Sequence, residues 1–458
     1  MNRTHQIGCI LGFLCLSIGF WSPFTQIPPP MQQALGMALF ALLFWTFEPV
    51  PVEYSSLFLL LLYPLTDTLS FQQSFGPFAD PTVWLIFAGM VLSLAISETG
   101  VGASIARYLQ RYISTNPARI IIQLHSVGLL AAFLVPSGVV RILLLMPIGR
   151  SICASYKTDH RQQFNSLVLI SLVSSTTFGG FGLLTGAVPN LVIAGQLEQM
   201  GYGTLYWSTW LVWMFPCVGL ARCTLSALII WYFFARNLGP LQRSSVDSTS
   251  APFGTEQWKV IAILCLGICL WATDAVHLIP PTHIALLLVL LLLAPTWGAL
   301  SLPQLRGLNF SFLFYIAALF SLGTALEQSG FNQYAMGYIS TWIDLHGWSM
   351  PLRYWGLTIL AVPLDFAMDI AAVAAVVTSP LIELAHAHGM ATLPSAMSIA
   401  LATSLVFLPY QAAPFMIAYS FREFPLSHLV LVQVILSTLS LIILYPLTIA
   451  YWNTMGLL

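Results

Sequence analysis

The sequence predicts an all-α integral membrane protein, with about 11 transmembrane helices plus two re-entrant hairpins arranged as two inverted repeats. Composition is the first observation: 58% of the 458 residues are apolar and only 7% are charged, whereas soluble domains carry about 25% charged residues. The second is a series of apolar runs, several of them interrupted by Gly and Pro, and the third is an internal repeat. The net charge of −1 gives no sign of nucleic-acid binding.

Apolar runs occur along the whole chain, and each is a candidate membrane helix. They are Ile7–Trp21, Leu35–Phe47, Ser55–Leu65, Val83–Ser97, Ile120–Ile148, Ser166–Ile193, Leu211–Phe234, Val260–Trp271, Ile284–Leu300, Phe310–Leu326, Trp355–Leu384, Ala396–Ser420 and Leu429–Tyr451. One crossing needs about 20 residues. Several runs are longer and are rich in Gly, Pro and Ser midway, which indicates broken helices and re-entrant hairpins.

The runs divide the chain into four parts. We expect N-terminal scaffold helices over 1–75, a first repeat over 76–234, a polar linker over 235–259 and a second repeat over 260–458. The first repeat should hold scaffold helices, a transport hairpin and a Gly/Pro loop. The first run, which follows Arg3 and His5, is expected to be an uncleaved helix rather than a signal peptide. Ala103–Ile113 should form an amphipathic helix at the membrane interface.

Three features occur twice in the same order. The segments Trp84–Gly100 and Phe312–Gly330 each end in a polar turn with Gly; Val135–Ile148 and Asp365–Ile382 each contain a proline; and Gly179–Gly195 and Phe407–Ser420 each hold a proline loop. The offsets agree, at 230 residues for Gly100 and Gly330, 233 for Pro147 and Pro380, and 225 for Pro189 and Pro414. Duplicated halves with broken helices are typical of secondary transporters.

Breaking residues gather in the first proline loop. Gly179, Gly180, Gly182 and Gly186 precede Pro189 and Asn190 in an apolar run. Such irregular backbone is tolerated at membrane depth only where protein buries it or where it lines a wet cavity. Its free carbonyls can bind cations, and the N–H groups of a half-helix can bind an anion. The alternative is a kinked helix that packs through small residues.

Charged residues also lie inside the runs. A charge at the bilayer centre costs at least about 2.5 kcal/mol, so Arg141 should face water, a carboxylate or a substrate anion. Asp365 and Asp369, four residues apart, occupy the corresponding region of the second half. An Arg141–Asp369 ion pair is one alternative, and a site for a substrate or a proton is the other. Arg222 is expected to snorkel to the interface or to pair locally.

At these motifs the chain resembles the divalent anion/sodium symporter family, which carries dicarboxylates and citrate. The resemblance rests on Phe78–Leu109, on GGFGLLTGAVPN at Gly179–Asn190 and on LPYQAAPF at Leu408–Phe415. In that family the hairpin tips carry Ser-Asn-Thr motifs that bind substrate carboxylates and sodium. Ser137-Gly138-Val139 and Met368-Asp369-Ile370 stand at these tips here. From the resemblance, and for Arg141 and Asp369 from their charges inside the apolar runs, we expect a set of substrate contacts: Ser137, Gly138, Val139, Arg141, Thr185, Gly186, Pro189, Asn190, Asp369, Ile370 and Pro414.

The expected function is secondary active transport of a small organic anion, similar to a di- or tricarboxylate, coupled to sodium or to protons. A sodium ion is expected near Ser137, Gly182 and Asn190, and no other cofactor is expected. The alternative is a sodium-independent carrier of the same fold for an inorganic anion, a metalloid or a zwitterion. We find no catalytic cluster and expect no enzyme. The resemblance implies a homodimer, and the chain should be a multi-pass protein of the inner (plasma) membrane, surrounded by lipid and without a nucleic-acid partner.

Overall fold

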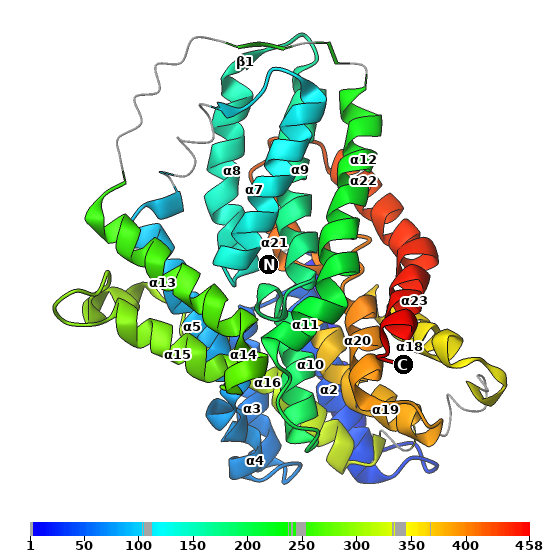
Figure 1. Ribbon diagram of the computed structural model, residues 1–458. Coiled ribbons are helices and arrows are strands. Elements are labelled where there is room, and N and C mark those ends of the chain that lie inside the picture. The colour runs from blue at the N-terminus through cyan, green and yellow to red at the C-terminus, as the bar shows by residue number, and fades with distance from the viewer. Residues whose placement is uncertain are drawn as a thin grey trace.

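The computed structural model describes residues 3–102, 104, 112–236, 238–239, 241–243, 253–331, 334, 345–366 and 368–458. It is helical apart from two short strands, β1 (Tyr156–Lys157) and β2 (Gln242–Arg243), which pair antiparallel. In the described residues, eight helices are long and apolar enough to cross a membrane, and five shorter apolar helices accompany them. The all-α membrane fold is therefore confirmed (Figure 1).

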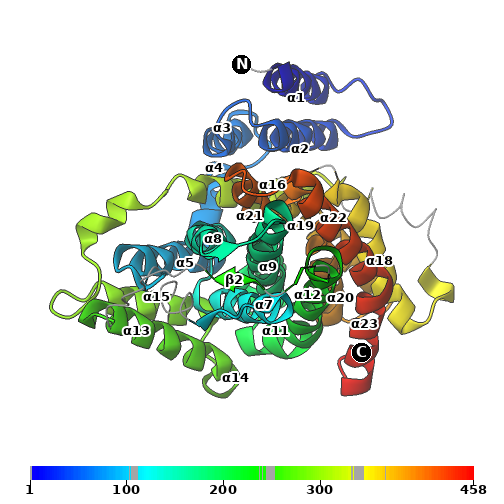
Figure 2. The ribbon, with the colours of Figure 1, turned by 90° about the horizontal axis from the view of Figure 1, so that it is seen from above.

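The N-terminal helices lie at the edge of the molecule. They are α1 (Arg3–Trp21), α2 (Pro29–Phe47), α3 (Val52–Leu65), α4 (Phe71–Phe75) and the 3₁₀ turn η1 (Gly76–Ala79). Figure 2 shows α1 as the outermost of these, packed alongside α2. Gly19 and Gly36 let the two backbones approach closely, because a Cβ on Gly19 would lie 2.9 Å from the Gly36 Cα. Small residues serve this purpose in membrane helix pairs.

The first half follows as α5 (Pro81–Glu98), α7 (Pro117–Leu134), α8 (Gly138–Ala154), α9 (Arg161–Phe181), η2 (Leu184–Gly186), α10 (Val188–Gln199), α11 (Trp207–Met214), η3 (Phe215–Ala221), α12 (Arg222–Ile230) and η4 (Trp231–Ala235). The second half comprises α13 (Thr255–Ala272), α14 (Asp274–His277), α15 (Pro281–Leu292), η5 (Leu302–Gly307), α16 (Phe312–Gln328), η6 (Leu345–Gly347), α18 (Met350–Asp365), α19 (Ile370–Ala387), α20 (Thr392–Thr403), η7 (Pro409–Gln411), α21 (Ala413–Ser420), α22 (Leu426–Leu439), η8 (Ser440–Leu444) and α23 (Tyr445–Met455).

The matched positions of the two halves have the same local structure. Gly100 and Gly330 both take positive φ, +69° and +80°, just beyond the ends of α5 and α16. Pro147 and Pro380 lie inside α8 and α19, and α10 and α21 each have a proline in the first turn. Each half thus has a helix, a hairpin and a broken helix in the same order. In Figure 1 the first hairpin lies in the upper half and the second in the lower half; their inversion across the membrane stays a prediction.

Two expected boundaries differ from the structure. The helix within Ile284–Leu300 ends at Leu292, because Pro295 cannot continue it. Within the expected linker 235–259, α13 already begins at Thr255. Most of the expected interfacial helix Ala103–Ile113 falls outside the described residues.

The broken helix α9–α10 lies at the centre of the molecule, as Figure 2 shows for α9. Every residue of α9 from Ser166 to Phe181 is buried. Small Ser, Thr and Gly side chains make this dense packing sterically feasible; Gly128 of α7, for example, packs directly against Ser175. The helix breaks are therefore held inside protein, as irregular backbone in a membrane requires.

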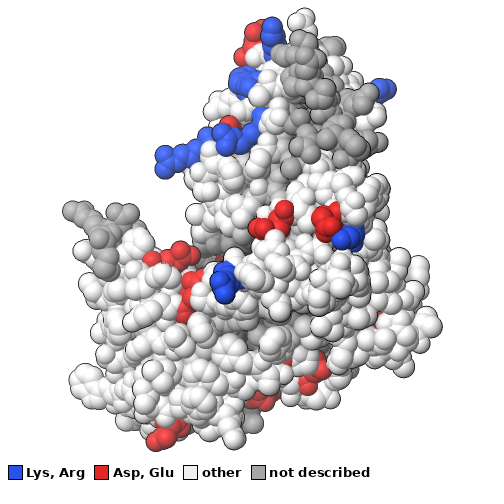
Figure 3. Space-filling view, turned by 90° about the vertical axis from the view of Figure 1, so that its left-hand side faces the viewer, with Lys and Arg blue, Asp and Glu red and all other residues white. Residues whose placement is uncertain are grey.

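Charges are distributed unevenly along the molecule. In the face shown in Figure 3, most Lys and Arg lie at the end where α8, β1 and the start of α9 lie. The opposite end carries Asp and Glu. Arg150, Lys157 and Arg161 belong to this basic end. By the positive-inside rule, a basic end of this kind is expected to face the cytoplasm, and the membrane orientation stays a prediction.

Candidate functional site

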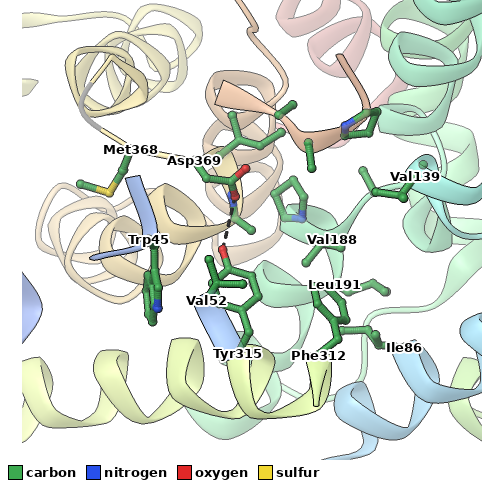
Figure 4. A pocket seen from close by; sticks show the side chains of 18 of the residues that line it. Trp45, Val52, Ile86, Val139, Val188, Leu191, Phe312, Tyr315, Met368 and Asp369 are labelled. Atoms are coloured by element: carbon green, nitrogen blue, oxygen red, sulfur yellow. Dashed lines mark hydrogen bonds between the residues drawn. The ribbon is translucent and has the colours of Figure 1, made fainter. Parts of the chain in front are cut away.

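A cavity of about 1380 Å³ lies where the hairpin tips and the helix breaks meet. It is also lined by α2, α5 and α16, through side chains such as Trp45, Ile86 and Phe312. Most of its wall is apolar, and Glu48, Arg141 and Asp369 are the acidic and basic (Lys/Arg) side chains among its described lining residues. Figure 4 shows Asp369 directed at Tyr315 within this apolar wall. Such a space suits a ligand that is fixed by a few polar groups.

The first hairpin tip is Val135–Ser137, between α7 and α8. The Ser137 side chain caps α8 by accepting a hydrogen bond from the Val140 N–H (3.4 Å). Arg141, one turn into α8, is buried and folds back toward the tip: Nη1 donates to the Val135 carbonyl oxygen and Nη2 to the Gly186 carbonyl oxygen, both at 2.7 Å. Its Nε–H has no hydrogen-bond partner among the described residues. Arg141 therefore joins the first tip to the first helix break.

The first break spans Gly182–Ala187, between α9 and α10. Its chain passes so close to the end of α9 that a Cβ on Gly186 would collide with the Gly180 carbonyl oxygen. The Asn190 amide spans the break, since Nδ2 donates to the carbonyl oxygens of Phe181 (3.1 Å) and Leu183 (2.8 Å). Glycine at position 186 is thus required by the close approach of two backbone segments.

The second hairpin tip lies between α18 and α19, and Asp369 caps α19. Asp369 Oδ1 accepts a hydrogen bond from the Ala371 N–H (2.8 Å) and a long one from the Tyr315 hydroxyl (3.5 Å). One carboxylate oxygen therefore serves the helix end, where the N–H dipoles favour negative charge. Sequence reasoning missed Tyr315, although a tyrosine in the apolar run Phe310–Leu326 was visible.

The second break spans Ser404–Ala412, and Gln411 organises it. Gln411 Oε1 accepts from the N–H groups of Phe407 and Leu408, both at 2.7 Å, and Nε2 donates to the Asp365 carbonyl oxygen (2.6 Å). Tyr410 adds a second link to the tip by donating to the Phe366 carbonyl oxygen (2.8 Å). Sequence reasoning also missed Gln411, although a polar amide within the apolar segment LPYQAAPF could have indicated it.

The predicted substrate contacts lie together in the structure. All of them except Asn190 line the cavity: Ser137, Gly138, Val139, Arg141, Thr185, Gly186, Pro189, Asp369, Ile370 and Pro414. The start of α8 also touches the start of α21, because a Cβ on Gly138 would lie 3.0 Å from Pro414 Cγ. The two halves therefore build one site, as the repeat predicts. The binding role of each residue stays a prediction.

The three residues expected near a sodium ion do not share the cavity wall. Ser137 lines the cavity, whereas a Cβ on Gly182 would lie 2.7 Å from the backbone of Gly219, in η3. Asn190 is buried behind the break, and in the described ranges its Oδ1 has no hydrogen-bond partner. The sodium position stays a prediction.

Two expectations for arginines are corrected. Arg141 and Asp369 form no ion pair: in the described part of the chain the ion pairs are Arg150–Glu423 and Lys259–Glu256. Arg222 does not snorkel, since it is fully buried and Nη1 donates to the carbonyl oxygen (2.7 Å) and hydroxyl (3.1 Å) of Ser404. Sequence position alone could not show that both guanidiniums bind backbone carbonyls at helix breaks.

Comparisons with known proteins agree with this architecture. The sequence profile of the citrate transporter family, CitMHS, matches residues 42–402. A protein described as a membrane protein from Cupriavidus necator is 23% identical over 374 residues, which cover 75% of this chain and 72% of that protein. The sodium-dependent dicarboxylate transporter SdcS of Staphylococcus aureus strain USA300 is 24% identical over 229 residues, 47% of this chain. The chain spans 43% of the length of that relative.

A solved structure has the same fold. The YdaH transporter of Alcanivorax borkumensis matches with a TM-score of 0.56 and 12% identity, over 94% of this chain and 99% of that one. These matches confirm the resemblance to anion carriers. They also confirm that the chain is a transporter rather than an enzyme, and that it is a multi-pass protein of the plasma membrane.

Proposed function

The chain belongs to the citrate transporter family, and from this membership we propose that it is a secondary active transporter of small organic anions. One observation supports this most directly: both hairpin tips and both helix breaks border a single cavity that contains a buried guanidinium. Substrate sites of secondary transporters lie where discontinuous helices of two repeats meet. Alternating access would then move these tips and breaks relative to the scaffold.

The proposed substrates are di- or tricarboxylates, and the proposed coupling ion is sodium or a proton. Arg141 supplies the positive charge for a substrate carboxylate, and its unpartnered Nε–H is a donor still to be satisfied. The N–H groups in the first turns of α8 and α10 add donors at the same cavity, near Ser137 and Pro189. SdcS, the similar protein named above, is a sodium-dependent dicarboxylate transporter.

Asp369 favours one alternative, a zwitterionic solute. Its carboxylate lines the same cavity as Arg141, so an ammonium group and a carboxylate of one molecule would each find an opposite charge.

The homodimer implied by the family resemblance is also proposed, and the mass of the detergent-solubilised protein, measured by light scattering, tests it.

Uptake into liposomes tests the function. The full chain is reconstituted, and entry of labelled citrate and succinate is measured with unlabelled carboxylates, amino acids and neutral solutes as competitors. We expect carboxylates to compete and neutral solutes not to compete. Competition by amino acids alone would favour the zwitterion, and absence of any carboxylate uptake would overturn the proposal.

A further inference from the structure

The two buried arginines share an unusual environment, because each binds the carbonyl side of a helix break. Arg141 Nη2 donates to the Gly186 carbonyl oxygen at the end of η2, and a Cβ on Gly180, in the last turn of α9, would collide with this nitrogen. Arg222 Nη1 donates to the carbonyl oxygen of Ser404, the C-cap of α20. The Arg222 guanidinium therefore binds the C-terminal end of α20, and the Arg141 guanidinium lies beside the last turn of α9 while it binds an unwound carbonyl of the first break.

The C-terminal end of a helix carries a partial negative charge of about half an electron. In transporters, such ends and the unwound carbonyls beside them coordinate the coupling cation. Here the guanidinium nitrogens lie within 2.7 Å of those oxygens, so a metal ion could not bind the same oxygens without displacing the arginines. Each break holds a positive charge that is covalently part of the chain.

Both charges are deeply buried and lack a carboxylate. Arg141 and Arg222 are 1% and 0% exposed, and in the part of the chain that the structure describes neither takes part in an ion pair. Arg222 lies over the Phe178 ring, with its Cζ 4.4 Å from the ring centroid. Its Nε and Nη2 have no hydrogen-bond partner within the residues that the structure describes. A buried charge is costly without compensation, so carbonyl dipoles and the ring face provide the stabilisation visible for Arg222.

We propose that Arg141 and Arg222 are built-in cations that replace coupling metal ions at the two helix breaks, so that transport by this chain needs no sodium. This inference rests on the proposed function and narrows its coupling ion. It also replaces the sodium ion expected near Ser137, Gly182 and Asn190. A substrate carboxylate in the cavity then interacts with the fixed charge of Arg141, while Arg222 binds the Ser404 carbonyl at the second break.

Ion replacement in the wild-type protein is the first test. Uptake of the carboxylate found in the liposome assay is measured in sodium chloride and in choline chloride at equal ionic strength. We expect the two rates to agree within about twofold, since the arginines already occupy the carbonyl oxygens of Gly186 and Ser404. A loss of about tenfold or more in choline would overturn the inference while leaving the proposed function intact.

Thermal stability in detergent is the second test, and it needs no substrate. We expect the melting temperature of the wild type to be the same in both salts. Arg141→Ala and Arg222→Ala should be less stable, and sodium should raise their melting temperatures by about 3 °C or more over choline, because the freed carbonyls become a cation site. Arg150→Ala, which removes an exposed arginine paired with Glu423, is the matched control without a sodium response.

The outcomes separate the two ideas. If no carboxylate is taken up, the proposed function fails and the stability measurement still decides on the built-in cations. A variant that folds but shows no sodium-specific stabilisation contradicts the assignment for that arginine. Where a variant does not fold, the wild-type measurement alone decides: a sodium-specific increase in its melting temperature would overturn the inference.

Discussion

At the residue scale, Arg141 and Asp369 line the same cavity but are held in different ways. Arg141 is fixed by two carbonyl oxygens, from the first tip and from the first break. Asp369 is held by backbone N–H groups at the start of α19 and weakly by the Tyr315 hydroxyl. Arg141 therefore has a large structural role, whereas the Asp369 carboxylate lies at the helix start in the cavity wall, where a ligand or a proton can reach it.

The substitution Asp369→Asn separates the charge of this residue from its capping role. Asn caps helices about as well as Asp, so we expect a melting temperature within about 2 °C of the wild type. Loss of the negative charge in the cavity should change carboxylate uptake by about tenfold, corresponding to about 1.4 kcal/mol. Liposome uptake at matched protein density measures this, and unchanged uptake would remove Asp369 from the mechanism. Asp67→Asn, at a turn outside the cavity lining, is the control.

At the element scale, the two helix breaks are shaped by different residues. The first depends on close backbone approach at Gly180 and Gly186 and on the Asn190 amide. The second depends on Gln411, which satisfies two N–H groups of the break and reaches the second tip. Particular residues thus fix the conformation of each break, and the breaks hold the tips in place. A separate prediction follows for each break.

For the first break, Gly186→Ala should abolish uptake without preventing membrane insertion. The added Cβ would collide with the Gly180 carbonyl oxygen, so the break must shift and move the Gly186 carbonyl away from Arg141. We expect at least about a tenfold loss of uptake, as for the loss of one charge-assisted hydrogen bond. Gly76→Ala is the matched control, because a Cβ there meets no atom within 4 Å. Equal uptake by both variants would show that the break tolerates a side chain.

For the second break, Gln411→Ala should mainly lower stability. It removes three hydrogen bonds at a buried position, and buried groups left unsatisfied cost about 1–3 kcal/mol each. We expect a decrease in melting temperature of several degrees, measured by heating the detergent-solubilised protein and quantifying the folded fraction by size exclusion. Gln304→Ala, which removes a half-buried capping glutamine of η5, should leave the melting temperature within about 1 °C. A smaller decrease for Gln411→Ala than for Gln304→Ala would contradict the assigned role.

At the scale of the whole molecule, the apolar runs and the repeated Gly and Pro residues predict most of the architecture. Pro189 and Pro414 mark the two breaks, and Gly100 and Gly330 mark two helix ends, because proline and positive-φ glycine have local backbone requirements that are visible in sequence. The partners of Arg141 and Arg222 could not be predicted in this way. They are backbone carbonyls 45 and 182 residues away, and every residue type carries a carbonyl.

The membrane orientation of the whole molecule makes the last prediction. Lys157 lies in β1, at the basic end of the molecule, and Gln72 lies in α4, at the opposite end in Figure 1. Because basic ends face the cytoplasm, a cysteine at position 157 should react with an impermeant maleimide only after the cells are permeabilised, and a cysteine at position 72 should react in intact cells. Both positions are exposed, and both substitutions, Lys157→Cys and Gln72→Cys, are made in a background whose native cysteines are replaced by serine. Labelling of both positions in intact cells would contradict their placement on opposite sides of the membrane, and the reversed pattern would show that the basic end faces outward.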